Sequence, residues 1–167
     1  MSKEIKKLKR EFDVPWITDD GYFDPSKFPV DTVLKQTLSK DYEQFWNGCR
    51  MMQTIYQSDR PEAGVYLLGL LHHYRNDLER LVVVVETLRG FHTIECADAL
   101  FSELLRIKSS NTTRKYLRMV IATLSSFPDG MVEEGFQRLA EDKSFSYRMR
   151  KKFRDILEMK RYRSLGY

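Results

Sequence analysis

Few side chains in this 167-residue chain have the type and spacing that catalysis or metal binding requires. His72 and His73 are adjacent, so on a helix they point about 100° apart and cannot share one metal ion as an i, i+4 pair would. His92 lies four residues before Cys96. A Cys–His nucleophile would need a thiol pKa lowered by a helix N-terminus. A small buried cysteine in an apolar helix is the simpler interpretation.

The carboxylates and short motifs also argue against catalysis. Glu133 and Glu134 fall in the first turn after Asp129, where negative charge stabilises a helix through its macrodipole. General acid–base catalysis instead requires two carboxylates that face one reacting group in a pocket. The sequence contains no Walker A or GxGxxG loop, no GxSxG or HExxH motif and no CxxC pair. We therefore predict a protein that is not an enzyme and that carries no cofactor or metal.

A cluster of cations near the C-terminus is the sharpest candidate for a binding site. On a helix, Arg148 and Lys152 would lie one turn apart, on a face opposite an apolar stripe that includes Phe153. The cations of this cluster are Arg148, Arg150, Lys151, Lys152, Arg154, Lys160, Arg161 and Arg163.

Three interpretations of this basic cluster are open. A basic helix suits an acidic surface on a protein partner, which is the interpretation we prefer. The same arginines, with interleaved tyrosines, could bind nucleic-acid phosphates and bases, helped by an N-terminal clamp. The clamp would consist of Lys6, Lys7, Lys9 and Arg10. The third interpretation is a solvated outer face on a terminal repeat.

Charge is distributed unevenly along the chain, whose formal net charge is +4. Residues 1–10 carry a net charge of +4 and residues 144–167 one of +6, so the remainder carries −6. Such asymmetry often marks a contact surface. No stretch approaches the roughly 20 apolar residues that span a bilayer. Because no secretory signal is recognisable and Cys49 and Cys96 are far apart, we expect free buried thiols and a cytoplasmic protein.

Composition divides the chain into four predicted segments. Residues 1–11 form a basic N-terminal segment, and residues 12–40 form a proline-rich, aromatic arm with a lead-in helix. Residues 41–160 form a helical repeat domain, and residues 161–167 form a basic C-terminal tail. Prolines disfavour helix in the arm. Its aromatic residues predict that the arm lies against the folded body and covers one end of it.

Apolar residues recur at helical spacing from about residue 31. The clearest predicted helices span residues 62–75, 78–89, 94–107, 113–127 and about 145–160. Residues 82–85 are four valines with high strand propensity, but no second segment could pair with them, so we predict a buried helix there. Local signals predict five helix boundaries. Pro61 lies in a first turn, Gly90 is a C-cap and Thr93 is an N-cap. A second N-cap lies within residues 109–112, and residues 128–130 form a turn.

An internal repeat connects these helices. Three helix ends carry a threonine followed by isoleucine or leucine, and Thr54, Thr87 and Thr123 lie 33 and 36 residues apart. A period of this length is typical of stacked helical hairpins, and the short gaps make neighbouring helices antiparallel. We therefore predict an all-α fold of antiparallel hairpins stacked as a short α-solenoid, with an irregular aromatic N-terminal arm. An irregular helical bundle is the alternative.

Over about residues 42–160 the chain resembles the HEAT and armadillo group of α-solenoid repeats in its architecture. The HEAT turn has an aspartate followed by a basic residue, which Asp59-Arg60 matches and the turns at 92–93 and 128–129 do not. The resemblance implies a broad surface for protein contacts, and hence a non-enzymatic adaptor. A HEAT-like enzyme, such as a DNA-repair glycosylase or a pigment lyase, is an alternative that rests on architecture alone.

Overall fold

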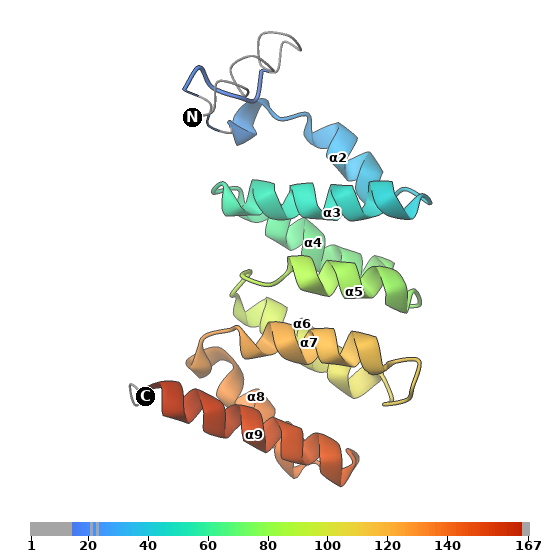
Figure 1. The fold of residues 1–167 in the computed structure, drawn as a ribbon, viewed down its shortest axis with the longest axis vertical. Helices are drawn as coiled ribbons and strands as arrows, with labels where there is room; N and C mark the ends of the chain where they lie inside the picture. Colours follow the sequence, from blue (N-terminus) through green and yellow to red (C-terminus); the bar gives the residue numbers. More distant parts are fainter. Residues whose placement is uncertain (1–14, 21, 23, 165–167) are drawn as a thin grey trace. The chain divides into compact units, whose positions relative to one another are not determined.

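The computed structural model describes residues 15–20, 22 and 24–164, which form the all-α fold that the sequence predicts (Figure 1). Neighbouring helices contact one another as stacked hairpins. Among the described residues, no helix is both long and apolar enough to cross a membrane. The chain divides into two compact units, residues 1–67 and 68–167, and each is described by itself.

The first unit is built around the contact between α2 (Val30–Thr37) and α3 (Tyr42–Gln57). The two helices approach so closely that a Cβ atom on Gly48 would lie 2.6 Å from the backbone nitrogen of Thr37. The Thr37 hydroxyl donates to the Leu34 carbonyl at 2.7 Å and shares a 2.7 Å hydrogen bond with the Tyr66 hydroxyl, on α4 (Pro61–His73). This buried threonine therefore ties α2 to α4.

The described part of the aromatic arm forms a turn that precedes the short 3-10 helix η1 (Pro25–Lys27). The backbone nitrogen of Thr18 donates to the Tyr22 carbonyl at 2.8 Å, and that of Asp24 donates to the Trp16 carbonyl at 2.7 Å. The Trp16 ring meets Phe28 edge-on, with ring centres 5.4 Å apart. Residues 1–11, with the proposed N-terminal clamp, lie outside the described residues. That the arm covers one end of the body stays a prediction.

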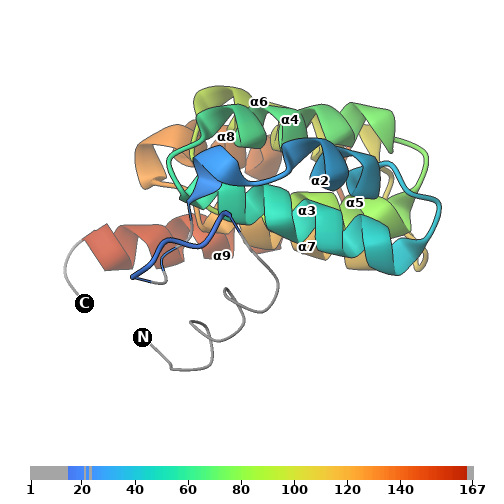
Figure 2. The ribbon, with the colours of Figure 1, turned by 90° about the horizontal axis from the view of Figure 1, so that it is seen from above.

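The second unit contains two layers of helices. α5 (Leu78–Thr87), α7 (Arg114–Ser125) and α9 (Tyr147–Ser164) form one layer, and α6 (Ile94–Arg106) and α8 (Asp129–Glu141) form the other (Figures 1 and 2). α5 packs against α7, α6 packs against α7 and α8, and α8 packs against α9. α7 and α9 run in the same direction, so both begin at the same edge of the unit (Figure 1). α9 continues to Ser164, beyond the predicted start of the tail at residue 161.

The valine run of α5 is helical, as predicted. Leu81 and all four valines at 82–85 are buried, because the layer surrounds this helix with apolar neighbours. Burial on several sides outweighs the strand propensity of β-branched residues.

Two of the predicted helix ends are confirmed, and three differ. Pro61 is the first residue of α4, and the Thr93 hydroxyl accepts from the backbone nitrogen of Cys96 at 3.1 Å. Gly90 is not the C-cap of α5, which is Leu88; it lies two residues further along, with φ +104°. The N-cap of α7 is Thr113, one residue beyond the predicted range. Its hydroxyl accepts from the Ser110 backbone nitrogen and donates to the Lys108 carbonyl, both at 2.8 Å, which closes this loop.

The predicted turn at residues 128–130 is wrong beyond Pro128. α8 begins at Asp129, and Pro128 is its N-cap residue. Gly130 and Gly135 weaken the helical signal in this segment, which is absent from the clearest predicted helices. Its apolar face nevertheless has helical spacing, with Val132, Phe136 and Leu139 buried.

The threonine repeat has a structural basis in two of its three copies. Thr87 is buried and donates to the Val84 carbonyl at 2.8 Å, and Thr123 is buried and donates to the Val85 carbonyl at 3.2 Å. The second of these bonds joins α7 to α5. Thr54 is exposed and donates to the Arg50 carbonyl within its own helix at 3.1 Å. Thr123 therefore links two helices of one layer, whereas Thr54 and Thr87 bond within their own helices.

Candidate binding groove between α7 and α9

An aromatic cluster holds α9 on α8. Phe153 is fully buried, with its ring centre 6.1 Å from Phe136 and 5.5 Å from Phe145, and Phe136 meets Phe101 of α6 at 5.3 Å. Gly135 makes room for this contact, because a Cβ atom there would lie 2.3 Å from the Phe101 ring. The apolar stripe predicted for the last helix therefore faces the core, and the cations of α9 occupy its remaining surface.

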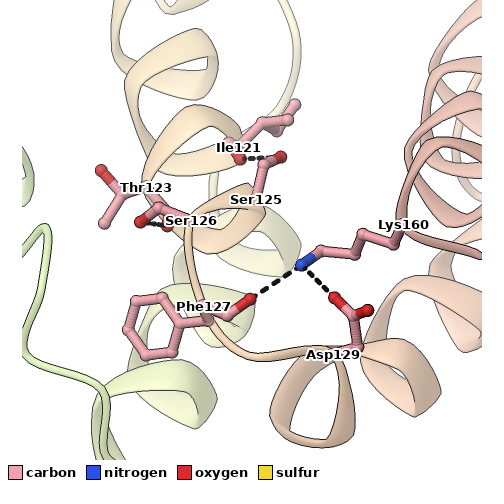
Figure 3. Close-up of polar contacts among 7 residues, drawn as sticks. All are labelled: Ile121, Thr123, Ser125, Ser126, Phe127, Asp129 and Lys160. Carbon is pink, nitrogen blue, oxygen red and sulfur yellow. Dashed lines mark hydrogen bonds and ion pairs between the residues drawn. The ribbon is translucent and has the colours of Figure 1, made fainter. Parts of the chain in front are cut away.

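Lys160 is an exception, and its predicted place on the exposed basic face is wrong. The side chain is buried, and its Nζ donates to the Phe127 carbonyl at 2.7 Å and to Asp129 Oδ1 at 2.8 Å (Figure 3). Phe127 follows the end of α7 and Asp129 begins α8, so the ammonium group ties α9 to the turn between them. The hydroxyls of Ser125 and Ser126 donate to carbonyls of the last turn of α7 beside it.

Three other cations of the predicted cluster lie near an acidic or aromatic group of the protein. Arg161 forms an ion pair with Glu133 of α8 at 3.6 Å. Arg150 lies near Asp142, whose pKa is lowered mainly by hydrogen bonds from Ser144 and further by this guanidinium group. Arg154 lies over the Tyr147 ring, 5.8 Å from its centre. The side chain of Arg163 lies outside the described residues.

The remaining three cations, Arg148, Lys151 and Lys152, line a groove between α9 and α7. Its volume is about 430 Å³. Two arginines of α7, Arg114 and Arg118, line the same groove. Its other lining residues are Leu117, Ile121 and Met149, which are apolar, together with Ser109, Ser146 and Asp155. We refer to these residues as the α7–α9 groove.

Positive charge in the α7–α9 groove is poorly compensated. Five cations and one carboxylate line it, a formal net charge of +4. The carboxylate, Asp155, already pairs with Lys151 at 3.3 Å. Among the described residues, no hydrogen bond or ion pair engages the side chains of Arg118, Arg148 or Lys152. Burial lowers the pKa of the Lys152 ammonium, and the nearby Arg118 lowers it further.

Arg114 and Arg118 are functional candidates that the sequence analysis missed. A signal was present, because the two arginines are four residues apart, on the side of α7 away from its buried Val120 and Leu124. Their significance depends on the stacking of hairpins, which places every second helix side by side. Only then do the paired cations of α7 meet Arg148 and Lys152 of α9.

The other candidates from the sequence do not come together as a site. His72 lines a shallow cavity of about 270 Å³ beside Glu103 and Arg106, whereas the His73 ring packs on Tyr74. Cys49 and Cys96 are free and buried, as predicted. Burial raises the pKa of the Cys96 thiol to about 12, the opposite of what a nucleophile requires.

In the described part of the chain, no three His, Cys, Asp or Glu side chains gather as metal ligands would. The α7–α9 groove is thus the strongest candidate, and its definition rests on charge, shape and apolar lining. No protein-family model matches this chain, and no curated protein or solved structure matches it at a significant level.

Proposed function

We propose that this chain is a HEAT-like helical-repeat protein that acts by binding rather than by catalysis. Its ligand is an acidic segment of a protein partner, which occupies the α7–α9 groove. The observation that carries the proposal is the meeting of five cations from two parallel helices around one groove. Three of these cations have no hydrogen-bond or ion-pair partner among the described residues. Helical-hairpin arrays use their extended surfaces mainly for protein contacts.

The apolar lining of the groove favours a protein segment over a nucleic acid. The half-buried Met149, above the largely buried Leu117 and Ile121, offers contacts to apolar side chains, which an acidic peptide carries and a phosphodiester backbone does not. Grooves for single-stranded nucleic acids combine cations with aromatic side chains on which bases stack. No aromatic residue lines this groove, and the exposed Tyr147 ring already contacts Arg154. The two free buried cysteines suit the reducing cytoplasm, the compartment we propose.

Charge reversal within the groove provides the test. In the double variant Arg118→Glu, Lys152→Glu, two cations of the groove become carboxylates that repel an acidic ligand. Binding of a fluorescein-labelled peptide of glutamate and leucine, followed by fluorescence anisotropy, should weaken at least about tenfold. The matched control, Arg89→Glu with Lys143→Glu, changes the net charge equally at exposed positions outside the groove. It should retain binding within about twofold.

Two outcomes would contradict the proposal. Equal losses in the two double variants would indicate attraction by net charge alone. Tighter binding of a single-stranded oligonucleotide, with an affinity that falls steeply as salt increases, would support the nucleic-acid alternative instead. Circular dichroism of each variant would establish that the helices are intact.

A further inference from the structure

The excess charge of the α7–α9 groove is larger than a single carboxylate would neutralise. The groove has a formal net charge of +4, and Asp155 is already engaged by Lys151. A phosphate monoester carries about −1.5 to −2 charges near neutral pH and three strong acceptor oxygens. One such group could accept from several of these cations at once, whereas a carboxylate has two oxygens and a single charge.

The kinds of cation in the groove also favour phosphate. Arg114 and Arg118 lie one turn apart on α7, and Arg148 and Lys152 lie one turn apart on α9. The planar guanidinium group presents paired donors that match two oxygens of a phosphate. Arg114 already donates to Asn111 Oδ1 at 2.7 Å, whereas Arg118 and Arg148 donate to no group in the part of the chain that the structure describes.

The backbone adds to this preference for a dianion. α7 and α9 begin at the same edge, and neither helix has an acidic residue in its first turn. In most helices an acidic side chain there offsets the positive end of the macrodipole. Here Arg114 and Arg148 stand in those turns instead, and Ser109 and Ser146 line the groove beside them. The positive potential of both helix ends therefore adds to that of the side chains.

We propose that the α7–α9 groove recognises a phosphorylated serine or threonine in the partner segment, with Arg118, Arg148 and Lys152 as the phosphate-binding residues. This inference rests on the proposed function, and it specifies the ligand of the same site. The apolar residues of the groove bind the side chains that flank the phosphorylated residue.

Three peptides of one glutamate and leucine framework test the inference on the full-length chain. The first has a central phosphoserine, the second has serine there, and the third matches the charge of the first with two additional glutamates. The phosphoserine peptide should bind at least about tenfold more tightly than the charge-matched peptide, because its oxygens converge at one point.

The pH dependence of binding gives a second test. No histidine lines the groove, and the second pKa of a phosphate monoester is about 6. Lowering the pH from about 7.5 to about 5.5 should therefore weaken only the phosphoserine peptide.

The variant Arg118→Lys separates geometry from charge. It keeps the positive charge but loses the paired donors, so it should weaken the phosphoserine peptide several-fold and leave the charge-matched peptide unchanged. Arg89→Lys, outside the groove, is the matched control. Equal affinity for the phosphoserine and charge-matched peptides would overturn this inference and leave the proposed function intact. If none of the three peptides binds, both this inference and the proposed function are overturned. Both are also overturned if an oligonucleotide displaces the labelled phosphoserine peptide at a lower concentration than the unlabelled phosphoserine peptide does.

Discussion

At the residue scale, the cations of α9 differ in environment far more than their spacing along the chain indicates. Arg148 and Lys152 line the groove and pair with none of the residues that the structure describes, whereas Arg161 pairs with Glu133 across the helix interface. Lys160 is buried and ties three elements together. A lysine is buried only when its ammonium group is hydrogen-bonded. Side chains of one type in a single helix thus differ in role, because some hold the fold together and others leave their charge exposed in the groove.

Replacement of Lys160 should affect stability rather than binding. Lys160→Met keeps much of the packing of the side chain but leaves the Phe127 carbonyl and the Asp129 carboxylate without their donor. A lost hydrogen bond to a charged group costs about 1.5–3 kcal/mol, so we expect a decrease of that size in the free energy of unfolding, measured in urea. Lys143→Met, at an exposed position, should change stability by less than about 0.5 kcal/mol. A similar small change for Lys160→Met would contradict the role of this residue as a tie between helices.

At the element scale, the spacing between α6 and α8 depends on a glycine. Gly135→Ala would bring a Cβ atom to 2.3 Å from the Phe101 ring, which is itself held by Phe136. Because the ring cannot move away freely, we expect a loss of about 1–3 kcal/mol in the free energy of unfolding. Gly69→Ala, in α4 with no atom within 4 Å of the new methyl group, should gain up to about 1 kcal/mol. A stabilised Gly135→Ala variant would show that α6 and α8 are less closely packed than described.

The elements themselves are largely predictable from the sequence, because each carries a local signal. α5, α6, α7 and α9 follow from apolar spacing, and Pro61 and Thr93 mark helix starts through the fixed φ of proline and the capping hydroxyl of threonine. α8 was less visible because two glycines lie within it, and its helicity comes from packing on α6 and α9. Local propensity therefore predicts elements well where packing and propensity agree.

The candidate site is less predictable than the elements, because it depends on which helices become neighbours. Linear spacing groups Arg148 with Arg150, Lys151 and Arg154, yet only Arg148, Lys151 and Lys152 line the groove. The missing half of the site, Arg114 and Arg118, comes from a helix more than thirty positions earlier in the chain. Such a long-range arrangement follows from the stacking of hairpins, and its side-chain detail appears only in the folded structure.

At the scale of the whole molecule, the two compact units each contain one buried cysteine, so thiol labelling reports on each unit separately. Cys49 lies in α3 of the first unit and Cys96 in α6 of the second. Both are inaccessible in the folded chain, and the raised pKa of Cys96 keeps its thiol protonated at neutral pH. We expect neither thiol to react with a disulfide reagent under native conditions, and both to react fully in strong denaturant.

Single-cysteine variants should then reveal the order in which the units open. Among the described residues, the first unit buries fewer large apolar side chains than the second, which contains the α5–α9 core. Regions with fewer buried contacts open at lower free energy. In a urea series, Cys49 in the Cys96→Ala variant should therefore become reactive at a lower urea concentration than Cys96 in the Cys49→Ala variant. Each variant's own unfolding curve, followed by circular dichroism, corrects for the effect of the substitution itself. Coincident labelling midpoints would mean that α4, which spans residues 61–73 and so belongs to both units, couples them into one cooperative structure.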